Sequence, residues 1–170
     1  MHMVIRAIVY AQDEKEGLEK AKTIFEGLCE GAGSHFDYYQ SFDEEGTPVS
    51  GKGRWGELPG IALVDSPEGK KLIEEGMWAT KKEFMTHLKI VRDVLASKSD
   101  AEIFGVEFDA EMFRYRCYCL GESEGPSVWL YDNNGEGVRT EERLTDTLRK
   151  WDSDEYKDLK VFVVPADVHF

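Results

Sequence analysis

Residues 3–10 form an apolar stretch in which Arg6 is the only charged residue. Successive side chains of a β-strand point to opposite faces, so a segment that is apolar at nearly every position is apolar on both faces. A strand of this kind is typical of the interior of a sheet. The stretch therefore predicts a strand at the centre of its sheet.

Three segments combine a helical spacing of apolar residues with residues that begin a helix. Asp13 and Glu16 form a capping-box pattern, Ser66 precedes a proline in a first turn, and Thr140 is a suitable N-cap. Gly76 lies inside the second segment and is expected to bend or split it. The predicted helices span residues 13–31, 66–96 and 140–151.

The other apolar segments predict strands. Residues 34–42 are rich in aromatic side chains, and residues 61–64 and 161–164 are short apolar runs. Pro165 is expected to end the last of these strands, because proline cannot donate to a ladder of hydrogen bonds.

A further strand is predicted over residues 113–119. One side of it carries aromatic residues and cysteines, and the other side carries Arg114, Arg116 and Tyr118. Residues 128–132 form a second apolar segment a short distance along the chain, so the two segments together predict a β-hairpin.

The order of these elements mixes hairpin and crossover connections. It predicts an α+β fold with a mixed or largely antiparallel sheet and three to four helices, and part of it fits a ferredoxin-like unit. A chain of 170 residues has the length of one domain. We therefore expect residues 1–170 to form a single domain, with a long Gly- and Pro-rich loop at residues 43–60.

This loop contains a near match to a phosphate-binding loop, from Gly46 to Gly53. Lys52 is in the required place, but Gly53 replaces the Ser or Thr whose hydroxyl would hold magnesium. Acidic residues precede the match and Gly and Pro follow it, whereas a true phosphate-binding loop joins a strand to a helix. We expect a flexible flap or interaction loop.

The charge of the chain excludes one class of partner. With 21 basic and 34 acidic residues the net charge is -13, which disfavours general binding of nucleic acid. The sequence contains neither a membrane-spanning apolar run nor a signal peptide, so we expect a cytoplasmic protein with no membrane partner. Three cysteines, an odd number, are expected to be free thiols.

The strongest candidate for a ligand site is a pair of arginines. On the predicted strand Arg114 and Arg116 share a side with Tyr118, a spacing that presents two guanidinium groups to a carboxylate or phosphate. The Gly-rich loop could add a basic and aromatic lip, made of Lys52, Arg54 and Trp55.

Other candidates compete with simpler structural explanations. Asp132, Asn134 and Glu136 place oxygen ligands at alternate positions, as in a calcium loop, but Asn134 is followed by a glycine and also suits a turn. No other metal site and no cofactor are expected. His169 is the candidate for acid–base catalysis, with Asp167 on the same side of the terminal segment.

These observations leave three functions open. The leading hypothesis is a non-enzymatic cytoplasmic protein that binds another protein or a small molecule, with sheet edges that allow a homodimer. The second is an enzyme that acts on a small phosphorylated or carboxylated substrate through Arg114, Arg116 and His169. The third is an acidic regulator or nucleic-acid mimic, which needs its carboxylates on one continuous face.

Overall fold

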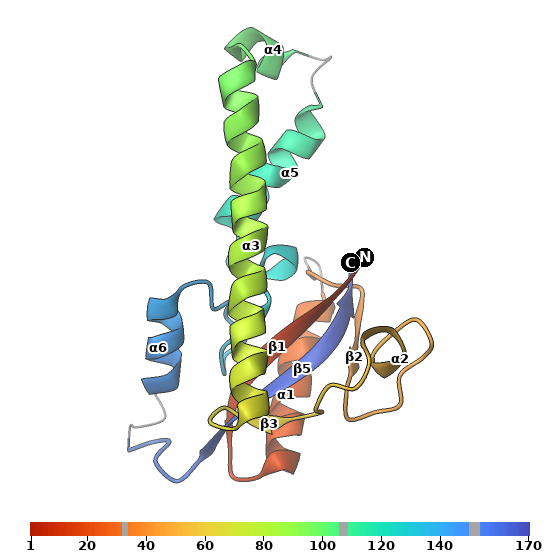
Figure 1. Ribbon diagram of the computed structural model, residues 1–170, viewed down its shortest axis with the longest axis vertical. Coiled ribbons are helices and arrows are strands. Elements are labelled where there is room, and N and C mark those ends of the chain that lie inside the picture. The colour runs from red at the N-terminus through yellow and green to blue at the C-terminus, as the bar shows by residue number, and fades with distance from the viewer. Residues whose placement is uncertain (32–33, 106–108, 150–153) are drawn as a thin grey trace.

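The computed structural model describes residues 1–31, 34–105, 109–149 and 154–170, which form an α+β fold around one open mixed sheet (Figure 1). Its strands are β1 (His2–Ala11), β2 (Tyr38–Ser41), β3 (Ala62–Leu63), β4 (Leu130–Tyr131) and β5 (Lys160–His169). The strand order is β2-β5-β1-β4, and β3 also pairs with β5. Only the β1–β4 pair is parallel among the pairings of these strands. The predicted class, the largely antiparallel sheet and the interior position of the first strand are confirmed.

β1 and β5 pair along their whole length, with His2 opposite His169, so the two ends of the described chain lie side by side (Figure 1). The predicted end of the last strand at Pro165 is wrong, because β5 continues through this residue. β2 pairs with residues 166–169 and β3 pairs with residues 162–163. Pro165 lies between these two stretches. Neither β2 nor β3 pairs with it, so neither strand needs the N–H that proline lacks.

β1 and β2 both run antiparallel to β5, so they are parallel to each other with β5 between them. Helix α1 (Glu14–Cys29) connects them. It begins as predicted, since the carboxylate of Asp13 accepts the N–H of Glu16 at 3.0 Å. The segment β1-α1-β2 is therefore a split β-α-β unit, which confirms the partial ferredoxin-like arrangement.

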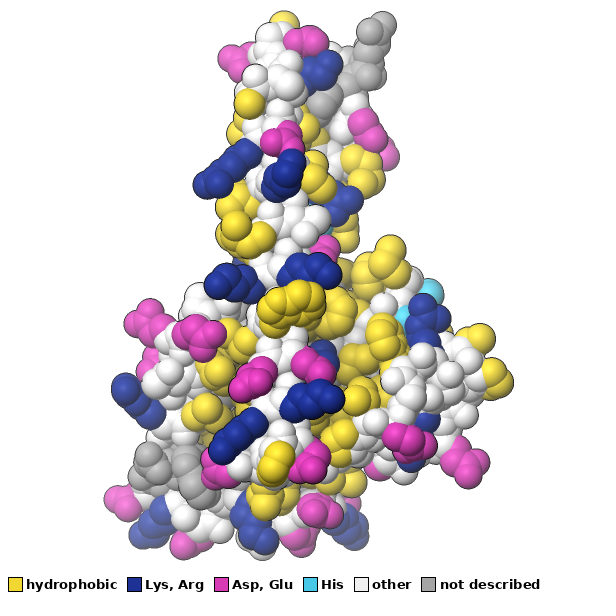
Figure 2. All heavy atoms as spheres, in the orientation of Figure 1, with side chains coloured by type: hydrophobic (Ala, Val, Ile, Leu, Met, Phe, Trp, Pro, Cys, Tyr) yellow, Lys and Arg dark blue, Asp and Glu magenta, His cyan; other side chains and the backbone are white. Residues whose placement is uncertain are grey.

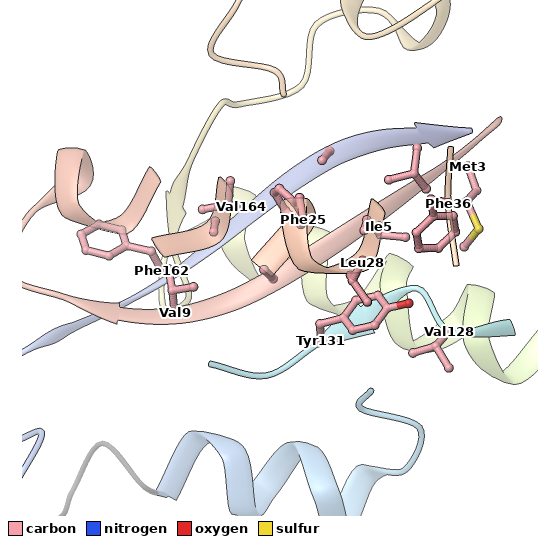
Figure 3. Close-up of a cluster of buried hydrophobic side chains, with 14 of the residues drawn as sticks. Met3, Ile5, Val9, Phe25, Leu28, Phe36, Val128, Tyr131, Phe162 and Val164 are labelled. Carbon is pink, nitrogen blue, oxygen red and sulfur yellow. The ribbon is translucent and has the colours of Figure 1, made fainter. Parts of the chain in front are cut away.

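Helices cover both faces of the sheet, and the alternation of β1 assigns its residues to two apolar clusters. Odd-numbered residues of β1 face α1, and the close-up of this cluster shows Met3, Ile5, Val9, Phe25, Leu28 and Phe162 (Figure 3). Even-numbered residues face helix α3 (Pro67–Ser97), in a cluster that includes Ile8, Tyr10, Leu72, Ile73 and Met77. Burial of these side chains on both faces accounts for the stability of a three-layer core.

α3 is one continuous helix of 31 residues, capped where the hydroxyl of Ser66 accepts the N–H of Gly69 at 3.0 Å. Gly76 does not split it. A Cβ atom at Gly76 would lie 3.2 Å from Cδ of Arg6 and 3.4 Å from Cβ of Leu130, so the glycine allows α3 to lie close on the sheet. Among the described residues, no helix is both long enough and apolar enough to cross a membrane.

The predicted strand over residues 113–119 is wrong, because these residues belong to helix α5 (Ala110–Gly121). The helix begins where the carboxylate of Asp109 accepts the N–H of Met112 at 3.1 Å. Phe, Tyr and Cys favour strands locally, but packing of this segment against α3 determines the helix. The predicted hairpin is wrong as well, since β4 pairs with β1 in parallel.

The remaining elements are short. They are α2 (Lys52–Trp55), α4 (Asp100–Phe104), the 3-10 turn η1 (Gly125–Ser127) and α6 (Glu141–Arg149). α6 begins as predicted, because the hydroxyl of Thr140 accepts the N–H of Arg143 at 3.1 Å. Residues 150–151 of the predicted third helix lie outside the described residues.

Candidate functional site

The C-terminal half of α3 extends beyond the sheet, and α5 returns along it after the short helix α4 (Figure 1). We call residues 78–121 the arm; its residues 106–108 are outside the described structure. The distal part of the arm stands clear of the rest of the chain, which we call the body (Figure 2). The base of the arm contacts the body, where the hydroxyl of Thr80 accepts the N–H of Trp129 at 2.9 Å. Two packed helices enclose little interior, so most side chains of the arm must face outward.

The arm and the body differ in charge. The arm contains seven Lys or Arg residues and seven Asp or Glu residues, so its formal charge is zero, whereas the whole chain carries -13. The body therefore carries the entire net negative charge. A projection with no net charge can approach another molecule with less electrostatic repulsion than the body generates.

The arm also concentrates exposed apolar area. Twelve large hydrophobic side chains are exposed in the described part of the chain, and seven of them lie on the arm, which is about a quarter of its length. They are Trp78, Met85, Leu95, Phe104, Met112, Tyr115 and Tyr118, with Phe104 95% exposed. Scattered exposed hydrophobic residues are ordinary, but a cluster on one projecting element is typical of an interaction surface.

His87 holds the two long helices of the arm together. It lies on α3 and is only 1% exposed. Arg116 on α5 donates from Nη1 to Nδ1 of His87 at 3.1 Å, and Nε2 of His87 lies 3.1 Å from a carboxylate oxygen of Glu83. Because Arg116 can only donate, Nδ1 must accept, and the proton of a neutral ring is on Nε2, where it bonds Glu83. Burial lowers the pKa of His87, and the positive charge of Arg116 acts in the same direction while Glu83 opposes it.

Two further contacts attach α5 at this level. Tyr115 meets the ring of His87 edge to face, with 6.0 Å between centroids, and burial together with contact to Cys119 raises the pKa of Tyr115 to about 12. Arg139, from the loop before α6, donates to the carbonyl oxygen of Leu120 at 3.2 Å and to that of Glu122. These carbonyls lie at the C-terminal end of α5, where a positive charge is favourable.

A second polar cluster lies at the paired ends of β1 and β5, and we call it the terminal cluster. Tyr38, His169 and His2 occupy one row across β2, β5 and β1, so their side chains share a face. Tyr38 stacks on His169 with 5.2 Å between ring centroids, and His169 lies 4.9 Å from His2. Asp37 accepts from Nδ1 of His169 at 2.8 Å.

A buried carboxylate, that of Asp167, contacts His2 of this cluster. Asp167 is 1% exposed, and its oxygens lie 3.0 and 3.1 Å from Nδ1 of His2. Nε2 of His2 is then free to accept from the hydroxyl of Tyr38, 3.4 Å away. The chain of Asp167, His2 and Tyr38 has the connectivity that orients an acid–base group.

Asp167 also explains the loop that resembles a phosphate-binding loop. The backbone N–H of Gly51 donates to Oδ2 of Asp167 at 2.9 Å, so an internal carboxylate occupies an amide that a phosphate would need. Gly51 has a φ of 56°, a conformation that favours glycine. The helix that follows, α2, has only four residues. The loop is thus bound to the sheet, rather than arranged around an empty nest of amides.

The structure separates the residues predicted to bind an anion. Arg114, Arg116 and Tyr118 lie on α5, where Arg114 and Tyr118 are exposed and Arg116 bonds His87. On a helix, two residues apart means about 200° around the axis, so the two arginines do not share a side. This is a correction that follows from the helical structure of the segment.

The lip and the acid–base candidate lie elsewhere, and they are neighbours. Lys52, Arg54 and Trp55 form α2, directly after the residue that bonds Asp167, and His169 belongs to the terminal cluster. Lys52 pairs with Glu57 and Arg54 lies over the ring of Trp55. This group lies on α2 and at the end of the sheet, whereas Arg114, Arg116 and Tyr118 lie on α5, so the structure does not assemble the site that the sequence predicted.

The segment considered as a cation loop has other partners. Oδ1 of Asp132 accepts the N–H groups of Asn134 and Glu136 at 2.9 and 3.1 Å, and Oδ2 accepts from Arg143 at 2.7 Å. Arg143 also pairs with the carboxylate of Glu136. Within the described residues no group of three or more His, Cys, Asp and Glu could hold a metal ion. Turn chemistry accounts for these side chains.

The sequence indicated His169 and Asp167 as candidates, but it indicated neither the uncovered arm nor the contact between His2 and Asp167. The sequence shows that Trp78 and Met85 lie outside the buried stripe of α3. It does not show that no other element covers these two side chains. His2 and Asp167 lie at opposite ends of the chain, and only the register of β1 and β5 brings them together. The alternation of each strand gives a side for every residue but not its neighbour on the next strand.

The chain belongs to the family described as Domain of unknown function (DUF7995), whose model matches residues 1–170. No curated protein and no solved structure matches it. The family description carries no activity, so the geometry of the arm and of the terminal cluster supplies the functional argument.

Proposed function

We propose that this protein is a non-enzymatic interaction protein that docks onto another macromolecule through its arm. The carrying observation is that the arm holds seven of the twelve exposed large hydrophobic side chains, while its formal charge is zero in a chain of charge -13. Exposed apolar area of this kind costs solubility unless a partner covers it, and it is what an interface core requires.

The contacts inside the arm support the same proposal. Only Thr80, His87, Val91 and Cys119 are buried among its described residues, so its interior supplies little of its own stability. The arm is instead positioned by polar contacts such as Arg116 to His87 and Arg139 to the end of α5. These contacts present the apolar side chains in a defined geometry, which reduces the ordering cost of binding.

Site-specific photo-crosslinking tests the proposal. A benzoylphenylalanine is placed at Met112 on the arm and, as a matched control, at Val49 on an exposed loop of the body. In an extract of the source cells we expect a discrete adduct from position 112 and little from position 49. The change Phe104→Ser in the arm should reduce the yield of that adduct about fivefold, since interface anchors typically contribute ~1 kcal/mol or more.

Equal adduct yields from the two positions would contradict the proposal, as would an adduct that Phe104→Ser leaves unchanged. The mass of the adduct also distinguishes a second copy of this chain from a different protein. A homodimer stays a prediction, and such an adduct with twice the chain mass would establish that the arm mediates it.

A second candidate function is acid–base catalysis at the terminal cluster. The observation in its favour is the buried carboxylate of Asp167, which holds His2 so that Nε2 faces the hydroxyl of Tyr38. Lys52 and Arg54 on α2 could attract a small anionic substrate to this end of the sheet. Thermal denaturation with a panel of phosphorylated and carboxylated metabolites tests it, since a bound substrate should raise Tm in the parent chain but not in His169→Gln/Tyr38→Phe.

The proposal of an acidic regulator or nucleic-acid mimic has less support. Figure 2 shows acidic and basic side chains alternating over the visible face of the body instead of a single acidic face.

Free thiols at Cys29, Cys117 and Cys119 agree with the cytoplasmic location that we propose for the protein.

A further inference from the structure

A cleft of about 600 Å³ lies where the arm meets the body, between α3 and the segment that leads into α6. Met77, Phe84 and Met85 give it apolar walls, and Lys81 and Arg139 bring two positive charges against the single carboxylate of Glu141. Methionine side chains adapt to irregular apolar partners, and the guanidinium of Arg139 lies over the ring of Phe84 at 5.3 Å. The cleft thus combines flexible apolar walls with a net positive charge.

The cleft continues into an outer face of α3 along the arm. At 100° per residue, one stripe roughly 140° wide contains the apolar residues of this face and all the basic residues of the helix beyond residue 77. The stripe has no carboxylate. It consists of Met77, Trp78, Lys81, Lys82, Met85, Leu88, Lys89, Arg92, Leu95 and Ala96.

The two acidic residues of this part of α3 lie outside the stripe. Glu83 is directed to His87, and Asp93 lies at the edge, where it pairs with Lys89 at 2.5 Å. Lys82 lies over the ring of Trp78 at 4.7 Å, which keeps a positive charge next to the apolar surface. Figure 2 shows basic and hydrophobic side chains together on the arm.

The positive charge of the stripe favours a partner with acidic residues over a second copy of this chain. A second copy that placed the same stripe face to face would oppose Lys81, Lys89 and Arg92 to their own equivalents, which is unfavourable. A partner with carboxylates beside an apolar row would pair with these cations instead. From residue 77 to residue 95 the stripe is about 27 Å long, which matches about 18 residues of a partner helix.

We propose that the cleft and this stripe of α3 bind an acidic amphipathic helix of a partner protein. The apolar row of that helix packs on Trp78, Met85 and Leu95, which are exposed. Its flanking carboxylates pair with the lysines and with Arg92. This inference rests on the proposed function, because it specifies the kind of partner that binds the α3 side of the arm.

Fluorescence anisotropy with designed peptides tests it on the full chain. The probe is an 18-residue helical peptide with leucines at positions i, i+3, i+4 and i+7 and glutamates beside them, and its counterpart carries lysines in place of the glutamates. We expect the glutamate peptide to bind about tenfold more tightly, a difference of about 1.4 kcal/mol. Lys81→Glu/Lys89→Glu should remove most of this preference.

The matched control is Lys15→Glu/Lys70→Glu, which changes the net charge by the same amount at exposed positions off the stripe. It should alter binding less than twofold. Met85→Asp should weaken binding about tenfold by placing a charge in the apolar row.

Three results would overturn the inference: equal affinity for the two peptides, equal effects of the two charge-reversed variants, or displacement of the peptide by vesicles with anionic headgroups. A fourth contrary result could come from sedimentation. It would be a dimer of the chain that Met85→Asp dissociates and that the glutamate peptide does not displace. If the arm adduct forms as expected while the two peptides bind with equal affinity, the proposed function stands and only this inference is contradicted.

Discussion

Arg116 donates a hydrogen bond to Nδ1 of His87 at 3.1 Å and thereby connects the two long helices of the arm through a buried imidazole. The same ring reaches Glu83 through Nε2. A protonated ring would lose the acceptor that Arg116 uses and would bring two positive charges into contact. The geometry of the arm therefore depends on a neutral histidine.

This dependence predicts a loss of stability in mild acid. The pKa of His87 is lowered in the folded protein, so between that value and the ordinary value of 6.5 the unfolded chain binds more protons than the folded chain. The stabilisation is complete above pH 6.5 and decreases as the pH falls below it. Thermal denaturation of the parent chain and of His87→Gln at pH 7.5 and 5.5 measures this effect. The parent should lose more, and each ~1 kcal/mol lowers Tm by about 2–4 °C. Equal losses would refute the assignment.

Asp167 is predicted to stabilise the junction between the sheet and the Gly-rich loop. Asp167→Ala removes the partner of His2 and of the Gly51 N–H, both at buried or partly buried positions, and should cost about 1–3 kcal/mol in urea denaturation. Hydrogen exchange should accelerate at residues 46–51. Asp37→Ala is the control, because this carboxylate is exposed and its removal should cost less than ~1 kcal/mol. Similar losses in the two variants would show that the loop does not depend on Asp167.

Two helical glycines should respond in opposite directions to alanine. A Cβ at Gly69 would lie 1.9 Å from the carbonyl oxygen of Leu63, so Gly69→Ala must displace α3 from β3 and should cost about 1–3 kcal/mol. A Cβ at Gly27 in α1 meets nothing within 4 Å. Gly27→Ala should therefore stabilise the protein by about 0.5–1 kcal/mol through helix propensity. Urea denaturation measures both, and destabilisation by Gly27→Ala would show that the open space is not available.

Arg139 is predicted to secure the C-terminal end of α5. Arg139→Ala removes donors to the carbonyls of Leu120 and Glu122 and should cost about 1–2 kcal/mol, with faster amide exchange in the last turn of α5. Arg114→Ala, at an exposed position on the same helix, is the control and should change stability by less than ~0.5 kcal/mol. If exchange in α5 is the same in both variants, Arg139 does not hold the helix.

Where local signals were strong, sequence reasoning succeeded. Asp13, Ser66 and Thr140 each cap the helix that their sequence pattern predicts, because an N-cap hydrogen bond spans only two or three residues. The doubly apolar segment at residues 3–10 is an interior strand for a related reason, since its composition requires apolar cover on both faces. These features need no knowledge of distant parts of the chain.

Where the partner is distant, local signals failed. Residues 113–119 alternate as a strand would, yet they form α5. Tyr115 meets the ring of His87 on α3, and Cys119, one helical turn further on, contacts Tyr115. That change of element separated Arg114 from Arg116 and removed the predicted anion site. Pro165 does not end β5, because it lies between the residues of β5 that pair with β2 and those that pair with β3.

The sequence by itself determined the α+β class, the central first strand, three helix starts and the excess of negative charge, because each follows from composition or from contacts within a few residues. Tertiary structure alone decided that the arm leaves its apolar side chains uncovered, and that Asp167 meets His2 and Gly51. The physical reason is that exposure and long-range pairing depend on which elements pack together. Local periodicity gives the side on which a residue lies, whereas the packing of distant elements determines whether anything covers that side.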